Sequence, residues 1–289
     1  MKKTFFSVIT ALFAVALFTS CTLFQSHKHA PITSGTTNLT LEGPAGKIMA
    51  ILETPSLKED QNCPFVILMH GFTSSKEDPI CAKVASSLRE KGIASIRFDF
   101  NGHGKSDGRF QDMTIRNEVQ DAQAVYDYVS KLDYITKIGI LGHSQGSLVC
   151  ALFAPKMNQK IDAMVLMAPA LSIPDGARAG RSAGASFDPN NVPENGVRIG
   201  NRILGKNYIV EAQQMNVWKE IKGFDKPVYL VRGTRDFVVS EENAKRIANT
   251  YADFKEKAYE GDDHGFSHNF AAACNGAADF LAEKLMKFK

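Results

Sequence analysis

The serine at position 144 stands in a pattern that can make a serine hydroxyl reactive. It lies in Gly142-His143-Ser144-Gln145-Gly146, between a short apolar run and a helical pattern of small residues. A buried strand, a sharp turn and a helix are the context in which a Gly-x-Ser-x-Gly serine projects its hydroxyl. The two glycines keep side chains away from the strained turn. We therefore predict that Ser144 is a nucleophile.

A serine hydroxyl is a poor nucleophile at neutral pH, so it needs a base and a group that orients the base. Asp236 follows the apolar run 228–231, and His264 lies in a loop between a short strand and the final helix. Strand carboxyl ends meet at one edge of a parallel sheet. We therefore predict that Ser144, Asp236 and His264 converge there as a catalytic triad.

Other polar residues near these motifs have structural interpretations. His70 is expected to fix its loop, His103 to support the wall of the site, His143 to pack and His268 to lie on the surface. Asp262 and Asp263 are neighbours of His264, but adjacent side chains point apart, so we expect them to shape the loop. His264 remains the predicted base.

An attack on a carbonyl group creates an oxyanion, which needs two preorganised N–H donors. The residue after the nucleophile, Gln145, supplies one backbone N–H. The other is expected from Phe72, in the loop after the strand that ends at Met69, where Gly71 permits close approach.

The rest of the chain alternates between strand and helix patterns. A hairpin at 39–41 and 47–52 precedes strands at 65–69, 94–100, 161–167, 228–231 and 255–259, and helices at 80–91, 115–132, 241–251 and 271–288. Such alternation predicts the α/β class, with a mostly parallel sheet covered by helices on both faces. The length of 289 residues suits one large domain of this kind.

The alternation breaks between residues 171 and 218, a stretch rich in Gly, Pro, Asn and Arg. A long irregular segment inside a compact domain is usually functional. Its position directly after the strand that follows the serine motif predicts a cap or lid over the site.

The N-terminus reads as a targeting segment. Lys2 and Lys3 precede a short apolar stretch, and the pattern before Cys21 resembles a bacterial lipoprotein signal. We expect residues 1–20 to be a signal peptide, Cys21 to be lipidated, 21–37 to be a flexible tether and 38–289 to be the folded domain. The protein is then exported and anchored in the envelope; a plain secretory signal is the alternative.

Composition excludes several functions. The net charge is only +3, and basic residues do not gather with aromatic ones, so no nucleic-acid partner is expected. The spacing of Cys63, Cys81, Cys150 and Cys274 predicts no metal site and decides no disulfide. A homodimer is a possible assembly on which the sequence is silent.

Together these motifs resemble the serine α/β-hydrolase superfamily, from residue 39 to the C-terminus. Further segments are similar to bacterial cinnamoyl (feruloyl) esterases, namely Gly142–Gly146, Ala168-Pro169-Ala170, Phe187-Asp188-Pro189, Leu204–Tyr208 with Ala212-Gln213-Gln214, and Gly261–His264. The resemblance implies an α/β-hydrolase fold, no cofactor or metal, and a small-molecule ester as substrate.

The same resemblance implies that Asp175 and Tyr208 contact the ring hydroxyl of a hydroxycinnamic acid such as ferulate or p-coumarate. This chain has Arg181-Ser182-Ala183-Gly184-Ala185 where family members often carry a glutamine. The alternatives are a broad carboxylesterase, an acylglycerol lipase or a small serine peptidase of the superfamily. A binding protein without activity is a further alternative, against which the intact triad argues.

Overall fold

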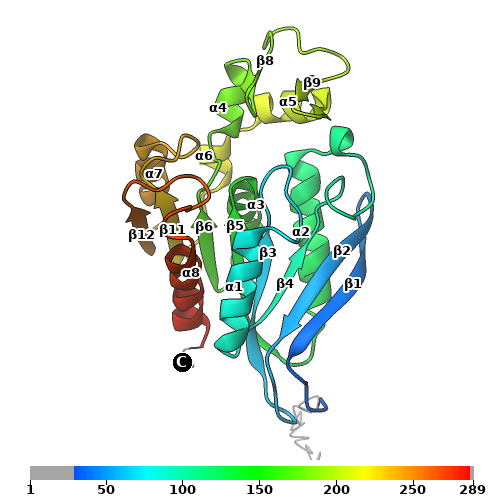
Figure 1. The fold of residues 1–289 in the computed structure, drawn as a ribbon, viewed down its shortest axis with the longest axis vertical. Helices are drawn as coiled ribbons and strands as arrows, with labels where there is room; N and C mark the ends of the chain where they lie inside the picture. Colours follow the sequence, from blue (N-terminus) through cyan, green and yellow to red (C-terminus); the bar gives the residue numbers. More distant parts are fainter. Residues whose placement is uncertain (1–28, 287–289) are drawn as a thin grey trace, which may run out of the picture.

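A computed structural model describes residues 29–286, and its centre is an eight-stranded sheet. The strands follow the order β1-β2-β4-β3-β5-β6-β11-β12 (Figure 1). Their bounds are β1 (Gly35–Gly43), β2 (Gly46–Thr54), β3 (Cys63–Met69), β4 (Ala94–Phe98), β5 (Ile135–His143), β6 (Ala163–Met167), β11 (Val228–Gly233) and β12 (Phe254–Tyr259). β2 pairs antiparallel with β1 and β4, and all neighbours from β4 to β12 are parallel. The predicted α/β class is confirmed.

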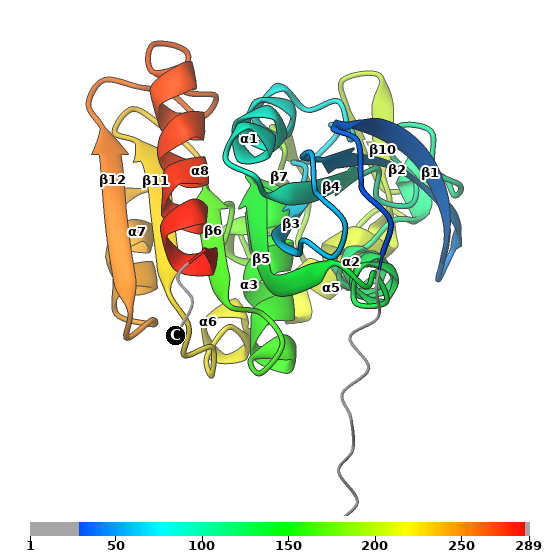
Figure 2. The same cartoon turned by 90° about the horizontal axis from the view of Figure 1, so that it is seen from below.

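Helices cover both faces of the sheet (Figure 2). On one face lie α1 (Pro79–Glu90) and α8 (Phe270–Leu285); on the other lie α2 (Ile115–Val129), α3 (Gln145–Phe153) and α7 (Glu241–Ala248). Two short 3-10 turns, η1 (Phe110–Asp112) and η2 (Ala154–Met157), join neighbouring elements. Each face of the sheet packs its own cluster of buried apolar side chains against these helices.

The burial of the central strands explains why their sequences are continuous apolar runs and do not alternate between apolar and polar residues. Every residue of β3, β4 and β6 is buried, because helices cover both faces of these strands. Two of the helices begin at a residue whose side chain caps the free N–H groups of the first turn. At the start of α2 the side chain of Thr114 accepts the N–H of Asn117, and at the start of α1 Asp78 accepts those of Ile80 and Cys81.

The folded domain begins earlier than the sequence predicted. His29 is buried against Tyr134, Ile32 forms a β-bridge with Leu57, and β1 starts at Gly35. The expected tether therefore cannot extend to residue 37, because residues 29–37 pair with the body of the domain. Cys21 and the predicted signal peptide lie outside the described residues.

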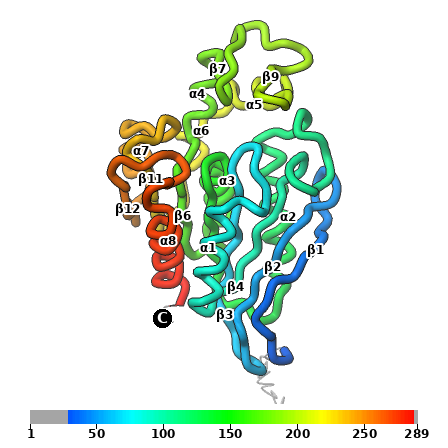
Figure 3. The backbone as a smooth tube through the Cα atoms, viewed as in Figure 1, coloured from blue at the N-terminus to red at the C-terminus, as the bar shows by residue number. Residues whose placement is uncertain are grey.

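The segment 171–218 forms a cap of short elements above the carboxyl ends of the strands (Figures 1 and 3). They are α4 (Ile173–Arg178), β7 (Arg181–Ser182), β8 (Ala185–Ser186), β9 (Val197–Ile199), β10 (Arg202–Leu204), α5 (Lys206–Gln214) and α6 (Val217–Glu220). Two separate helices, α5 and α6, end the cap, because Met215 leaves the helical backbone between them. Elements this short give little periodic signal.

The cysteines at 63, 81, 150 and 274 are free and buried. Burial raises the pKa of the Cys63 thiol to about 11, so this thiol stays protonated near neutral pH. Within residues 29–286, no group of three or more His, Cys, Asp or Glu side chains could hold a metal ion. No helix in that part of the chain is both long and apolar enough to cross a membrane.

Candidate active site

Ser144 sits in the sharp turn between β5 and α3. Its backbone has φ 54° and ψ −117°, a conformation that L residues rarely adopt. The turn is held from β6, since the N–H of Ser144 donates to the carbonyl of Met167 at 2.9 Å. The hydroxyl of Ser147 donates to the carbonyl of Gly142 at 2.6 Å and closes the turn from below. The predicted strand, turn and helix around the serine are therefore present.

The structure brings the three predicted side chains into one hydrogen-bonded chain. His264 Nε2 lies 2.9 Å from the Oγ of Ser144, and His264 Nδ1 lies 2.8 Å from Oδ2 of Asp236. The other oxygen of Asp236 accepts the N–H groups of Val238 and Val239 at 2.7 and 3.2 Å. Asp236 is thereby fixed from its own loop and aimed at the imidazole.

The loop that carries His264 is shaped by its two preceding aspartates, as predicted. Buried Asp262 accepts the N–H groups of His268 and Asn269 at 3.0 Å each. Asp263 accepts the N–H groups of Gly265 and Ser267, also at 3.0 Å. The hydroxyl of Ser267, which donates to Asp263 at 2.6 Å, and these N–H groups lower the pKa of Asp263. In Asp262 burial acts to raise the pKa, but the hydrogen bonds prevail and lower it.

A mostly apolar cavity opens at the hydroxyl of Ser144. Both residues predicted to donate to an oxyanion, Phe72 and Gln145, line it. Gly71 lies directly against the serine, since a Cβ added at Gly71 would lie 3.1 Å from the Cβ of Ser144. The remaining lining residues are Ala170, Ile173, Ser182, Ala183, Tyr208 and Val238. The cap thus supplies one wall of the cavity.

His70 fixes the loop that carries Phe72. Its Nδ1 lies 2.8 Å from the carbonyl of Gly71, and its Nε2 accepts the N–H of Phe100 at 3.2 Å. Burial lowers the pKa of His70, so its neutral form is favoured. His103 packs 5.2 Å from the ring of His70 and edge-on to Phe110, in the wall behind this loop.

His143 turns away from the cavity toward α1. Its Nε2 lies 3.3 Å from the carbonyl of His264, and its Nδ1 lies 3.6 Å from Oδ2 of Asp78. Burial opposes the ionisation of Asp78, but its interactions with His143 and with the helix N–H of Cys81 prevail and lower its pKa. His143 therefore connects the loop of His264 with the start of α1.

The two tentative ring-binding residues lie in different places. Tyr208, on α5, is buried and lines the cavity of Ser144, and its hydroxyl donates to Oε1 of Gln145 at 2.6 Å. Asp175, on α4, instead pairs with Arg178 at 2.6 Å and lines a separate depression beside Trp218. The structure therefore does not bring Asp175 to Ser144, because the helix turns this carboxylate toward the arginine three residues later.

Sequence reasoning missed a buried carboxylate behind Gln145. Glu118, on α2, accepts hydrogen bonds from Nε2 of Gln145 to both of its oxygens, each at 2.8 Å. Burial raises the pKa of Glu118, and the nearby Asp121 raises it further. A signal was present, since Glu118 occupies the apolar stripe of this helix between Ile115 and Ala122.

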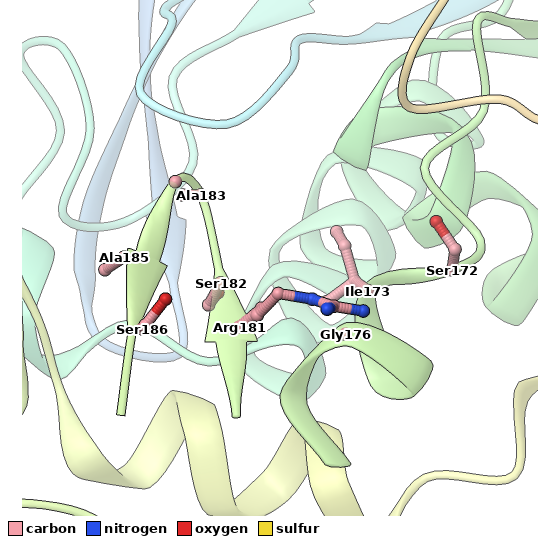
Figure 4. A pocket seen from close by; sticks show the side chains of 9 residues that line it. Ser172, Ile173, Gly176, Arg181, Ser182, Ala183, Ala185 and Ser186 are labelled. Atoms are coloured by element: carbon pink, nitrogen blue, oxygen red, sulfur yellow. The ribbon is translucent and has the colours of Figure 1, made fainter. Parts of the chain in front are cut away.

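A second hollow adjoins the cavity on the cap (Figure 4). The two share Ile173, Ser182 and Ala183, and the hollow continues along the β7–β8 hairpin. The side chain of Arg181 extends from β7 toward α4. The outer part of the site therefore includes one charged side chain, whereas the described residues that line the part next to Ser144 include none.

The sheet order, the turn at Ser144 and the cap inserted after β6 define a serine α/β hydrolase. Residues 60–209 match the family described as serine aminopeptidase, S33, and the chain belongs to this family. The match therefore places the chain among the serine hydrolases.

Two groups of solved structures are similar over most of the chain. A structure titled ferulic acid bound to Est1E, from Butyrivibrio proteoclasticus, is 34% identical and covers 86% of this chain and 100% of its own, with a TM-score of 0.82. An esterase of Pyrococcus furiosus is 20% identical, covers 88% of this chain and 92% of its own, and has a TM-score of 0.63, which shows the shared fold.

The curated relatives match over a shorter stretch. Human protein ABHD12B is 28% identical over 109 residues, which are 37% of this chain and 29% of the relative. The chain thus spans less than a third of that relative's length.

Proposed function

We propose that this protein is a carboxylic-ester hydrolase that releases hydroxycinnamic acids from plant-derived esters through an acyl-enzyme. The observation that carries the proposal is the chain from Asp236 through His264 to Ser144, which ends in an apolar cavity beside Tyr208. Support for the acyl group comes from the similarity to the Est1E structure with bound ferulic acid.

In the proposed mechanism, Nε2 of His264 takes the proton of Ser144 as the hydroxyl attacks the ester carbonyl. Asp236 holds the imidazole in orientation and stabilises its charged form. The backbone N–H groups of Phe72 and Gln145 stabilise the oxyanion. His264 then gives its proton to the leaving alcohol. Water, activated by the same histidine, attacks the acyl-enzyme and releases the acid.

The cavity wall suits an aromatic acyl group. The rings of Phe72 and Tyr208 lie 6.0 Å apart, and Ala170, Ile173 and Val238 complete an apolar surface. The hydroxyl of Tyr208 gives its proton to Gln145, so toward a substrate it can act only as an acceptor. A phenolic hydroxyl, which has a proton to donate, satisfies this requirement.

Replacing Ser144 with alanine tests the nucleophile. Ser144→Ala should lower kcat for methyl ferulate by about 10⁴-fold or more, because base and acid have no nucleophile to activate. The variant should keep the far-UV circular dichroism and melting temperature of the wild type, and a fluorophosphonate probe should no longer label it. If this variant turned over methyl ferulate as fast as the wild type, Ser144 could not be the nucleophile.

Substrate preference needs a separate comparison of methyl ferulate, methyl p-coumarate and p-nitrophenyl butyrate. We expect the highest kcat/KM with the hydroxycinnamates. A clear preference for the aliphatic ester would favour a broad carboxylesterase or an acylglycerol lipase and leave the mechanism in place.

The family description raises aminopeptidase activity as a second candidate. An aminopeptidase must hold the positively charged α-amino group of its substrate, for which a carboxylate in the cavity is the usual partner. Among the described residues that line the cavity of Ser144, none carries a carboxylate. We therefore expect hydrolysis of amino-acid p-nitroanilides to be far slower than hydrolysis of esters.

A further inference from the structure

We propose that Glu118 is a positioning residue that holds the oxyanion-binding N–H of Gln145 in place, while Tyr208 ties the same glutamine to the cap. This inference rests on the proposed function, because it gives the N–H of Gln145 a role in ester hydrolysis. We use the term relay for the hydrogen-bonded side chains of Glu118, Gln145 and Tyr208.

The relay joins three elements that are far apart in sequence. Glu118 comes from α2, Gln145 is the first residue of α3, and Tyr208 comes from α5 in the cap. Both ends of the Gln145 amide are held, Oε1 by Tyr208 at 2.6 Å and Nε2 by Glu118 at 2.8 Å. All three side chains are buried, with exposures of 1%, 0% and 2% in chain order. Bonds of this kind are costly to lose, because water cannot replace them.

The amide of Gln145 matters because of the backbone next to it. Ser144 is held in a strained conformation that the surrounding structure must maintain. An oxyanion donor that moves by a fraction of an ångström loses much of its effect, since its value lies in preorganisation. Because the side chain of Gln145 is fixed at both ends, movement of the backbone that carries its N–H is restricted.

The relay also gives the cap a connection to the reacting groups. Tyr208 lines the cavity and contacts the amide of Gln145, so displacement of α5 pulls on the residue that follows Ser144. The position of the cap and the position of the oxyanion donor are therefore linked.

The test compares Glu118→Leu with the wild type on p-nitrophenyl acetate, whose acetyl group is too small to need the cap. We expect kcat and kcat/KM to fall together by about tenfold, with KM unchanged, because the donor acts in the transition state. This loss is smaller than that from removing a donor outright. Glu118→Gln keeps an acceptor for Nε2 of Gln145 and should restore part of kcat.

Glu53→Leu is the matched control. Glu53 is another buried carboxylate, held by Arg97 on the outer part of the sheet and not among the residues that line the cavity of Ser144. Glu53→Leu should lower the melting temperature, while kcat stays within twofold of the wild-type value. If Glu53→Leu loses as much kcat as Glu118→Leu at the same temperature, the effect is general destabilisation and the inference fails.

A double-mutant cycle that combines Glu118→Leu with Tyr208→Phe tests whether Glu118 and Tyr208 both act through Gln145. The losses of kcat on p-nitrophenyl acetate should be less than multiplicative in the double variant, because either change frees the same amide. Independent, fully multiplicative losses would contradict the relay.

The rate at which a fluorophosphonate labels Ser144 gives a readout that does not need turnover, because this reaction also develops charge in the oxyanion hole. It should fall about tenfold in Glu118→Leu. A wild-type protein that is labelled but hydrolyses no ester would refute the proposed function, and the labelling rates would still test the role of Glu118. Equal labelling rates of the wild type and a folded Glu118→Leu would overturn the inference about Glu118.

Discussion

At the scale of single residues, the reactivity of Ser144 depends on neighbours that have no side chain. A Cβ placed on Gly142 would lie 2.2 Å from the backbone carbon of Gly146, and one on Gly146 would lie 2.2 Å from the carbonyl oxygen of Met69. Both obstacles are backbone atoms of packed elements, which cannot rotate away as a side chain could. The spacing of the two glycines is therefore a packing requirement for bringing α3 against β3 and β5.

Gly146→Ala should consequently cost about 3 kcal/mol of folding free energy, at the upper end of overpacking effects, and abolish ester hydrolysis. The matched change is Gly276→Ala in the final helix, where an added Cβ would approach nothing closer than the Tyr259 hydroxyl at 3.6 Å. That variant should gain about 0.5–1 kcal/mol from helix propensity and keep its activity. Urea unfolding of both measures the contrast, and a stable, active Gly146→Ala would refute the packing argument.

At the scale of elements, the sheet carries the reacting groups and the cap selects the substrate. Ser144, Asp236 and His264 follow β5, β11 and β12, neighbours or near neighbours at one edge of the sheet. The cap approaches from above that edge, and its hairpin residues Ser182 and Ala183 enter the cavity wall. Changes in the hairpin should thus alter substrate preference and leave the chemistry intact.

Ser182→Phe places a ring in the space we assign to the aromatic acyl group. We expect kcat/KM for methyl ferulate to fall by about tenfold or more, and that for p-nitrophenyl acetate to change less than twofold. Ser186→Phe is the control, because Ser186 lines the adjoining hollow but not the cavity of Ser144 (Figure 4). Equal effects of the two substitutions on methyl ferulate would contradict this assignment of the cavity.

The length of an element decides whether the sequence could predict it. Strand β3 is a continuous apolar run and helix α2 has a strong helical period, so both could be predicted. The positions of the serine, the acid and the histidine after parallel strands place these three residues at one edge of the sheet. The cap elements are too short for periodicity, so neither the break at Met215 nor the direction of Asp175 could be read. The contact of Glu118 with Gln145 joins separate helices, which only the packed structure specifies.

At the scale of the whole molecule, buried titratable groups couple stability to pH in opposite directions. Burial, assisted by the nearby His70, lowers the pKa of His103 to about 3 from its ordinary 6.5. Burial raises the pKa of Asp121 to about 7 from 3.8, although the N–H of Asn101 opposes the shift. The effect of Asp121 falls between pH 3.8 and about 7 and that of His103 between about 3 and 6.5, so the two overlap from pH 3.8 to 6.5.

Asp121 retains its proton in the folded state at pH values where the unfolded chain has released it. Its contribution to stability is therefore fully present below pH 3.8 and is lost as the pH rises through 7. Asp121→Asn, which can still accept the N–H of Asn101, removes this loss. Urea unfolding at pH 5 and pH 8 should show the variant gaining more stability relative to the wild type at pH 8 than at pH 5, because at pH 5 the wild type has lost only part of this contribution.

His103 has the opposite sign. The unfolded chain takes up a proton on this imidazole below pH 6.5, whereas the folded chain does so only near pH 3, so stability is full above pH 6.5 and falls steadily as the pH drops toward 3. His103→Phe keeps an aromatic ring against Phe110 and removes the proton uptake. The acid-unfolding midpoint should move to lower pH in this variant, while stability at pH 8 changes little. Circular dichroism during an acid titration measures the midpoint, and an unchanged value in His103→Phe would show that His103 does not contribute to acid unfolding.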